Sequence, residues 1–68
     1  MEIERAKRCK VGDVVHVPAD RGDPAGWGKV KHIGGAVAKT LNGTEYVWIT
    51  VRHNGLLHSS VWSSNRLG

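Results

Sequence analysis

Two Asn-Gly dipeptides, at 42–43 and 54–55, constrain the fold of this 68-residue chain more than any other feature. Between alternating apolar and polar residues, Asn-Gly is the strongest short-range signal of a β-hairpin, because both residues tolerate the positive φ that tight turns require. From Val11 onward, β-branched residues alternate with polar ones and helical periodicity is absent. The sequence therefore predicts an all-β domain over residues 11–68.

The placement of Gly and Pro sets the limits of the expected strands. Pro18 ends the first strand and begins a polar surface loop that runs to Gly26. Gly34-Gly35 indicates a bulge or sharp bend that lets one long ribbon serve two sheets. Residues 63–67 are expected to form a closing 3₁₀ turn. The five expected strands cover residues 12–17, 27–33, 36–41, 45–52 and 56–62.

Five strands this short are too few for two sheets with a thick core between them. A small, strongly bent barrel removes its own edges and is the economical arrangement. Residues 1–10 differ in composition and favour a helix, with Ile3, Ala6 and Cys9 three residues apart. Because so short a helix is unstable alone in water, we expect a basic arm or a helix docked on a five-stranded barrel.

The pairing register of the last hairpin decides which side chains face solvent. A two-residue turn at 54–55 places Trp62 opposite Val47, whereas a three-residue loop with a glycine bulge places Val61 there. The second register gathers the aliphatic side chains on one face, so we predict the bulged loop. The first Asn-Gly turn, taken as two residues, pairs Ala38 with Val47.

This register leaves aromatic and basic side chains outside the core. Aromatic rings surrounded by cations stack on nucleic-acid bases or anchor protein interfaces. The chain has no Phe, so its three Trp residues are also candidates for filling the core, and their placement stays open at this stage. The candidate binding residues are Tyr46, Trp48, Trp62, His58, Arg52, Lys29, Lys31 and Lys39.

The charge distribution agrees with an anionic partner. The net charge is +4, and residues 28–68 alone hold five Lys or Arg against one Glu, which also gives +4. Such a surplus permits contact with phosphate polyanions. One Cys and four His lack the spacing of zinc sites, and no nucleophile has a base beside it. We therefore expect no catalytic residue, metal or cofactor, although an active site shared between subunits stays open.

Location and assembly follow from length and hydropathy. No run approaches the roughly 20 apolar residues of a membrane span, and the first ten residues carry charges where a signal peptide is apolar. We expect a cytoplasmic protein without membrane contact. A chain this short buries only about 60% of its surface, and a single Cys cannot form an internal disulfide, so we expect a dimer or larger homo-oligomer.

Three segments resemble small SH3-like barrels of the KOW and Tudor type. They are Val11-Gly12-Asp13-x-Val15-x-Val17, Gly26-Trp27-Gly28-Lys29-Val30 and the terminal Ser63-Ser64-Asn65-Arg66-Leu67. The resemblance covers residues 11–67 and implies a barrel that binds RNA, ribosomal partners or protein tails. It departs from the pattern at its end, because no full strand follows the terminal turn to pair with the first strand.

The layout is more distantly similar to the type II dihydrofolate reductases, SH3-like tetramers with one active site in a central pore. Their folate-binding segment is replaced here by His-Ser-Ser-Val-Trp at 58–62, so the resemblance implies assembly and not activity. We predict a non-enzymatic module that binds nucleic acid through its basic aromatic face. The alternative is a protein-interaction or self-assembly module that uses the same face.

Overall fold

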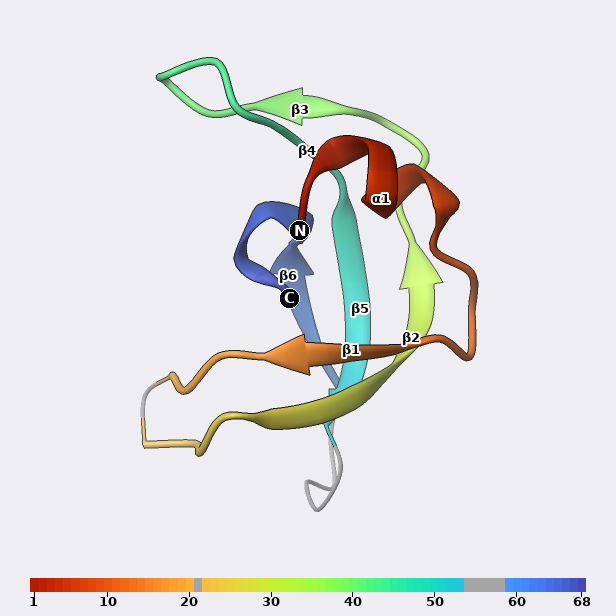
Figure 1. Ribbon diagram of the computed structural model, residues 1–68, viewed down its shortest axis with the longest axis vertical. Coiled ribbons are helices and arrows are strands. Elements are labelled where there is room, and N and C mark those ends of the chain that lie inside the picture. The colour runs from red at the N-terminus through yellow and green to blue at the C-terminus, as the bar shows by residue number, and fades with distance from the viewer. Residues whose placement is uncertain (21, 54–58) are drawn as a thin grey trace.

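The structure is a computed structural model that describes residues 1–20, 22–53 and 59–68. It is mostly β, with a four-stranded antiparallel sheet in the order β1-β2-β5-β6 and a two-stranded ribbon, β3-β4 (Figure 1). The predicted all-β character and the closing 3₁₀ turn are confirmed. In chain order the elements are α1 (Ile3–Arg8), β1 (Val14–Val17), β2 (Gly26–Ile33), β3 (Ala38–Lys39), β4 (Glu45–Tyr46), β5 (Trp48–His53), β6 (Ser59–Ser63) and the 3₁₀ helix η1 (Ser64–Arg66).

The predicted strand 45–52 is divided at Val47 into β4 and β5. The reason lies in the hydrogen bonds of Val47, whose N–H donates to Ser64 Oγ over 3.1 Å and whose carbonyl accepts from the Ser64 N–H over 2.9 Å. The N–H and the carbonyl of Val47 thus form hydrogen bonds with η1 and not with a neighbouring strand. Ser64 is fully buried, and this exchange satisfies its hydroxyl and its amide.

The first Asn-Gly turn is a three-residue loop, so the predicted pairing of Ala38 with Val47 is wrong and Ala38 pairs with Tyr46. Gly43 has a φ of +87° and donates its N–H to the carbonyl of Thr40 over 3.0 Å. Thr40 also donates its N–H to the carbonyl of Thr44, which closes the loop at 2.9 Å. This is the glycine-bulged geometry predicted for the other Asn-Gly turn, at 54–55.

The register of the last hairpin also differs from the prediction. Ile49 lies opposite Trp62 and Val51 opposite Ser60, so Trp62 faces the core while Val61 is 61% exposed. The indole carries far more apolar area than a valine side chain, and burial of the larger group is favoured. The turn residues 54–58 lie outside the described residues.

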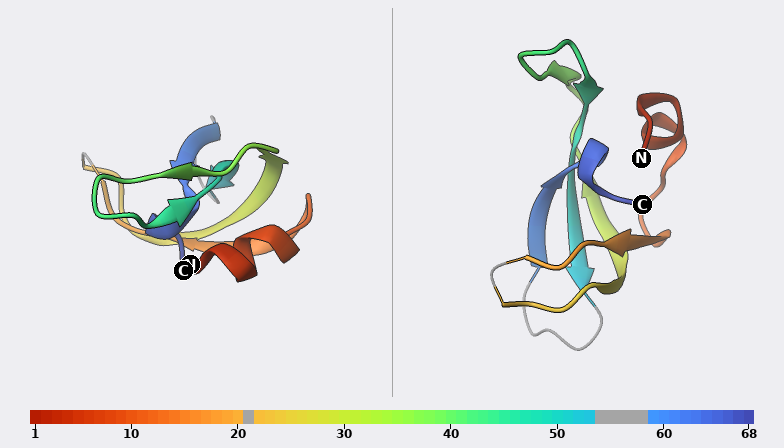
Figure 2. Two further views of the ribbon diagram at one scale, coloured as in Figure 1. Left: turned by 90° about the horizontal axis from the view of Figure 1, so that it is seen from above. Right: turned by 60° about the vertical axis from the view of Figure 1, so that its left-hand side comes forward.

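The core lies between α1, η1 and the side of the sheet that faces them (Figure 2). Two glycines of β2 make room for it. A Cβ at Gly28 would lie 2.5 Å from Cγ1 of Val51, and one at Gly26 would lie 2.7 Å from Nε2 of His53. The buried apolar residues are Ala6, Val15, Val17, Val30, Val47, Ile49, Val51, Trp62 and Leu67.

The end of the chain lies along β1. Gly68 donates its N–H to the carbonyl of His16 over 2.9 Å and accepts from the His16 N–H over 3.1 Å. The amino group of Met1 donates to the carbonyl of Leu67, so the two ends of the chain lie side by side, as Figures 1 and 2 show. Gly68, which follows the terminal turn, thus pairs with the first strand.

Candidate functional site

The side of the sheet turned away from the core, here called the outer face, presents alternate residues of its four strands. One row runs straight across the sheet, from Val14 in β1 through Lys29 and Arg52 to Ser59 in β6. The outer face as a whole comprises Val14, His16, Trp27, Lys29, Lys31, His32, Trp48, Thr50, Arg52, Ser59, Val61 and Ser63.

The outer face is basic. Lys29 and Arg52 lie directly opposite each other in neighbouring strands, and both are exposed. Like charges in this position repel each other, and an anion between them relieves the repulsion. Lys31 adds a third exposed cation at the bulge of β2, and the outer face contains no Asp or Glu. The arrangement suits an anionic ligand.

One exposed tryptophan lies near the start of β2. Trp27 is 57% exposed, and its ring meets that of His16 edge to face, with centroids 5.2 Å apart. Trp27 is not among the residues predicted to bind a partner. Its flanking glycines were the available signal, because two residues without side chains on the core side indicate that the tryptophan between them points outward.

A second exposed tryptophan lies at the start of β5. Trp48 is 49% exposed and meets Tyr46 edge to face, with centroids 5.3 Å apart and an angle of 86° between the rings. This T-shaped contact fixes the orientation of the indole while leaving much of it in solvent. Trp48 and Arg52 lie on the same side of β5, as the alternation of a strand requires.

Three of the seven predicted site residues that the structure describes do not belong to the outer face, namely Trp62, Lys39 and Tyr46. Trp62 is only 9% exposed and belongs to the core because of the register described above, and Arg66 stacks on its ring 4.8 Å from the centroid. Lys39 lies in the β3-β4 ribbon, opposite Glu45, and not in the four-stranded sheet. His58 lies outside the described residues. Tyr46, half-buried, supports Trp48 from β4.

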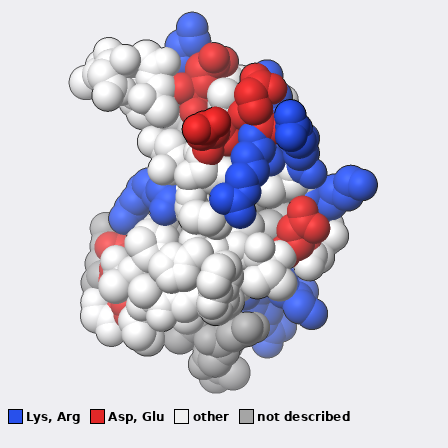
Figure 3. All heavy atoms as spheres, in the orientation of Figure 1, with Lys and Arg blue, Asp and Glu red and all other residues white. Residues whose placement is uncertain are grey.

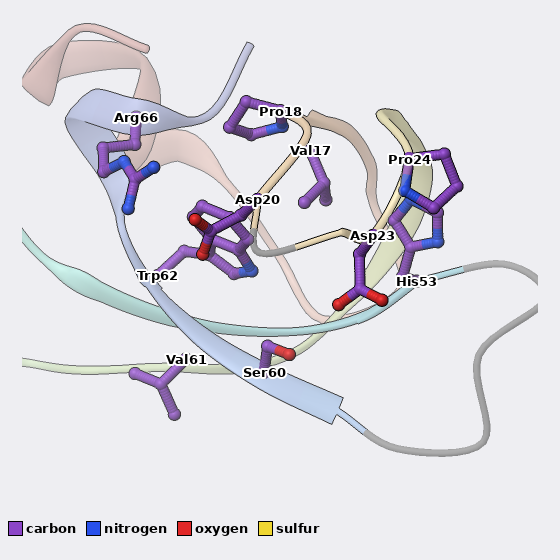
Figure 4. A pocket seen from close by; sticks show the side chains of 10 residues that line it. All are labelled: Val17, Pro18, Asp20, Asp23, Pro24, His53, Ser60, Val61, Trp62 and Arg66. Atoms are coloured by element: carbon purple, nitrogen blue, oxygen red, sulfur yellow. The ribbon is translucent and has the colours of Figure 1, made fainter.

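A pocket of about 330 Å³ opens beside β6, and we call it the acidic pocket. Asp20 and Asp23 exchange two backbone hydrogen bonds, of 3.1 and 2.8 Å, and Figure 4 shows both carboxylates turned into the pocket near Trp62 and Ser60. Its lining residues are Val17, Pro18, Asp20, Asp23, Pro24, His53, Ser60, Val61, Trp62 and Arg66.

A second pocket, of about 300 Å³, lies where α1 meets the start of β1, and we call it the basic pocket. Arg5 and Arg8 line it, and Figure 3 shows Lys and Arg side chains around α1 with Asp and Glu side chains among them. Asp13 also lines it, and its Oδ2 accepts the Lys10 N–H over 2.9 Å. The other lining residues are Cys9, Val14 and Val15.

The thiol in the basic pocket is not activated. Burial raises the pKa of Cys9, the charge of Asp13 raises it further, and the charge of Arg5 opposes both. The thiol donates to Sδ of Met1 over 3.7 Å. Cys9 is therefore a neutral side chain near neutral pH, and the charge of this pocket comes from its arginines and Asp13.

Within residues 1–20, 22–53 and 59–68, no three His, Cys, Asp or Glu side chains come together in a way that could hold a metal ion. No helix in the same part of the chain has the length and hydropathy of a membrane span. Comparison with protein-family models, curated proteins and solved structures gives no match to this chain.

Proposed function

We propose that this protein binds single-stranded nucleic acid through its outer face. The observation that carries the proposal is the cross-strand pair of Lys29 and Arg52, two exposed cations held opposite each other on a face without acidic residues. A backbone phosphate between them contacts both cations and offsets their mutual repulsion. Such contacts release counterions from the nucleic acid and supply the sequence-independent part of the affinity.

The exposed indoles favour a single strand over a duplex. Trp27 and Trp48 present ring surface on the same face as the cations, and stacking of one base on an aromatic ring contributes roughly 1–3 kcal/mol. In a duplex the bases are stacked on each other and do not offer this surface. The combination of cations and indoles is typical of grooves that bind single strands without sequence preference.

The test is the salt dependence of binding to fluorescein-labelled oligo(dT) of about 12 nucleotides, measured by fluorescence anisotropy. Each phosphate contact to a single strand contributes a slope of roughly 0.7 to the logarithm of affinity against the logarithm of salt concentration. Lys29→Ala and Arg52→Ala should each lower the slope by about that amount. Lys7→Ala on α1 removes the same charge from an exposed helix position outside the outer face and serves as the control. Binding without salt dependence, or equal slopes for all three variants, contradicts the proposal.

A second candidate function, self-association, is favoured by the apolar part of the same face. Val14 and Val61 are exposed there together with the two tryptophans, and exposed apolar groups of this kind mark interfaces. Sedimentation of the protein and of Trp48→Ala distinguishes the two functions. An oligomer that Trp48→Ala converts to a folded monomer identifies an interface between copies, whereas a monomer in both cases excludes it.

We further propose that the fold is a small SH3-like barrel. The order of the sheet strands, the 3₁₀ helix after β6 and the pairing of Gly68 with His16 support this assignment. In such a barrel the residues after the 3₁₀ turn pair with the first strand. Hydrogen exchange tests it: the amide hydrogen of Gly68 should be protected, and exchange at the rate of an unstructured peptide would contradict the assignment.

A further inference from the structure

We propose that the basic pocket continues the nucleic-acid interface around the β1 edge of the sheet, with a backbone phosphate held between Arg5 and Arg8. This inference rests on the proposed function. It gives the N-terminal helix a role in binding, and it sets a direction in which a bound strand leaves the sheet.

Continuity between the outer face and the basic pocket comes from Val14. This residue stands in the row with Lys29 and Arg52, and it also lines the basic pocket. Neighbouring strands are about 4.8 Å apart, so the path from Arg52 past Lys29 to Val14 is roughly 10 Å long. Among the described residues β1 is the last strand of the sheet on that side, and Gly68 bonds to its edge at His16, two residues from Val14.

The other end of the outer face, at β6, is unfavourable for a polyanion. There Val61 connects the outer face to the acidic pocket, which holds Asp20 and Asp23 from the connection between β1 and β2, and Arg66 as its one Lys or Arg among the described residues. Two carboxylates repel a phosphate within the Debye length, which is about 8–10 Å at ordinary salt concentrations. Electrostatics therefore favour the path past Val14 to α1 over the path past Val61 into the acidic pocket.

The basic pocket has the chemistry that a phosphate requires. Arg5 and Arg8 are three residues apart and therefore neighbours on one side of α1. Guanidinium groups bind phosphate oxygens through paired N–H donors. The carboxylate in this pocket belongs to Asp13, which already accepts a backbone hydrogen bond from Lys10. Cys9 carries no charge there, so the two arginines determine the sign of the pocket.

The experiment compares two lengths of labelled oligo(dT). A strand of about 4 nucleotides covers the sheet alone, whereas one of about 12 reaches α1 as well. Arg5→Ala and Arg8→Ala should each weaken binding of the longer strand roughly three- to tenfold at low salt and leave the shorter strand unaffected. Lys7→Ala is the matched control, because it lies on the same helix and does not line the pocket. Circular dichroism of each variant verifies that the fold is kept.

The outcomes separate this inference from the proposed function. If Arg5→Ala and Arg8→Ala behave like Lys7→Ala on the longer strand while Lys29→Ala and Arg52→Ala weaken both lengths, the extension is wrong and the proposed function stands. Equal losses on both lengths also contradict the extension, since the shorter strand does not reach α1. If Lys29→Ala and Arg52→Ala change the binding of neither strand length, the proposed function itself fails.

Discussion

The two edges of the four-stranded sheet, β1 and β6, differ both in charge and in what they bury. At the β6 edge Trp62 is part of the core, and the adjacent pocket contains Arg66 together with Asp20 and Asp23 from the connection between β1 and β2. At the β1 edge Val14 is exposed, and the adjacent pocket contains Arg5 and Arg8. A net charge of +4 does not convey this difference. If the protein binds a polyanion as proposed, the different charges of the two pockets set the direction of the bound strand.

The largest expected effect concerns Trp62, whose buried indole in β6 stabilises the fold. Trp62→Ala should lower the free energy of unfolding by about 3–5 kcal/mol, because it removes a buried indole and leaves a cavity beside Ile49. Urea unfolding followed by circular dichroism measures the change. The control, Trp27→Ala, removes an exposed indole and should change stability by less than about 0.5 kcal/mol. Equal stabilities for the two variants would show that Trp62 is not a core residue.

The next effect concerns the buried hydroxyl that attaches η1 to the sheet. Ser64→Ala leaves the N–H of Val47 without its acceptor in a buried position, and it should lower the free energy of unfolding by about 1–3 kcal/mol. Ser59→Ala at the exposed start of β6 is the control and should leave the urea midpoint unchanged. A Ser64→Ala protein as stable as the parent would contradict the role given to this hydrogen bond.

A smaller effect tests the acidic pocket directly. Asp23→Asn keeps the shape of the side chain and removes one negative charge near the β6 edge, so oligo(dT) should bind roughly two- to fourfold more tightly at low salt. Glu45→Gln in the ribbon is the isosteric control, because that charge is already opposite Lys39. The comparison between the edges fails if Asp23→Asn weakens binding, or if Glu45→Gln strengthens it equally.

The smallest effect reports on the basic pocket through Cys9. Iodoacetamide reacts with the thiolate, so a raised pKa means slower alkylation at pH 8 than for an unperturbed thiol. Asp13→Asn should lower the pKa and accelerate the reaction, whereas Arg5→Ala should raise the pKa and slow it. Changes of roughly twofold are measurable by mass spectrometry. Changes of opposite sign in the alkylation rates of the two variants support the proximity of Asp13 and Arg5 to the thiol. Changes of the same sign contradict it.

Local pattern was sufficient to predict the β character, the short N-terminal helix as one of two options, and the 3₁₀ turn. It was not sufficient to assign the two Asn-Gly turns. At 42–43 the side chains of Thr40 and Thr44 both bond to Asn42, and they stabilise a three-residue loop that the dipeptide alone does not specify. The register of β6 was decided by the burial of Trp62, which is a tertiary effect.

The candidate site was predicted in part for the same reason. Lys29, Lys31, Arg52 and Trp48 lie on the outward side of β2 and β5 although the last hairpin has another register than predicted, because strand alternation fixes their side. Trp62 was misplaced because its side depends on that register. The contribution of Arg5 and Arg8 depends on where α1 docks, and no spacing within the sequence encodes that position.

The tryptophan indole signals in a nitrogen-proton NMR spectrum test the central claim most directly, because the chain has three Trp residues. We predict that titration with oligo(dT) shifts the indole signals of Trp27 and Trp48, on the outer face, and leaves that of the buried Trp62 in place. A titration that shifts the Trp62 signal while those of Trp27 and Trp48 stay unchanged would contradict the account.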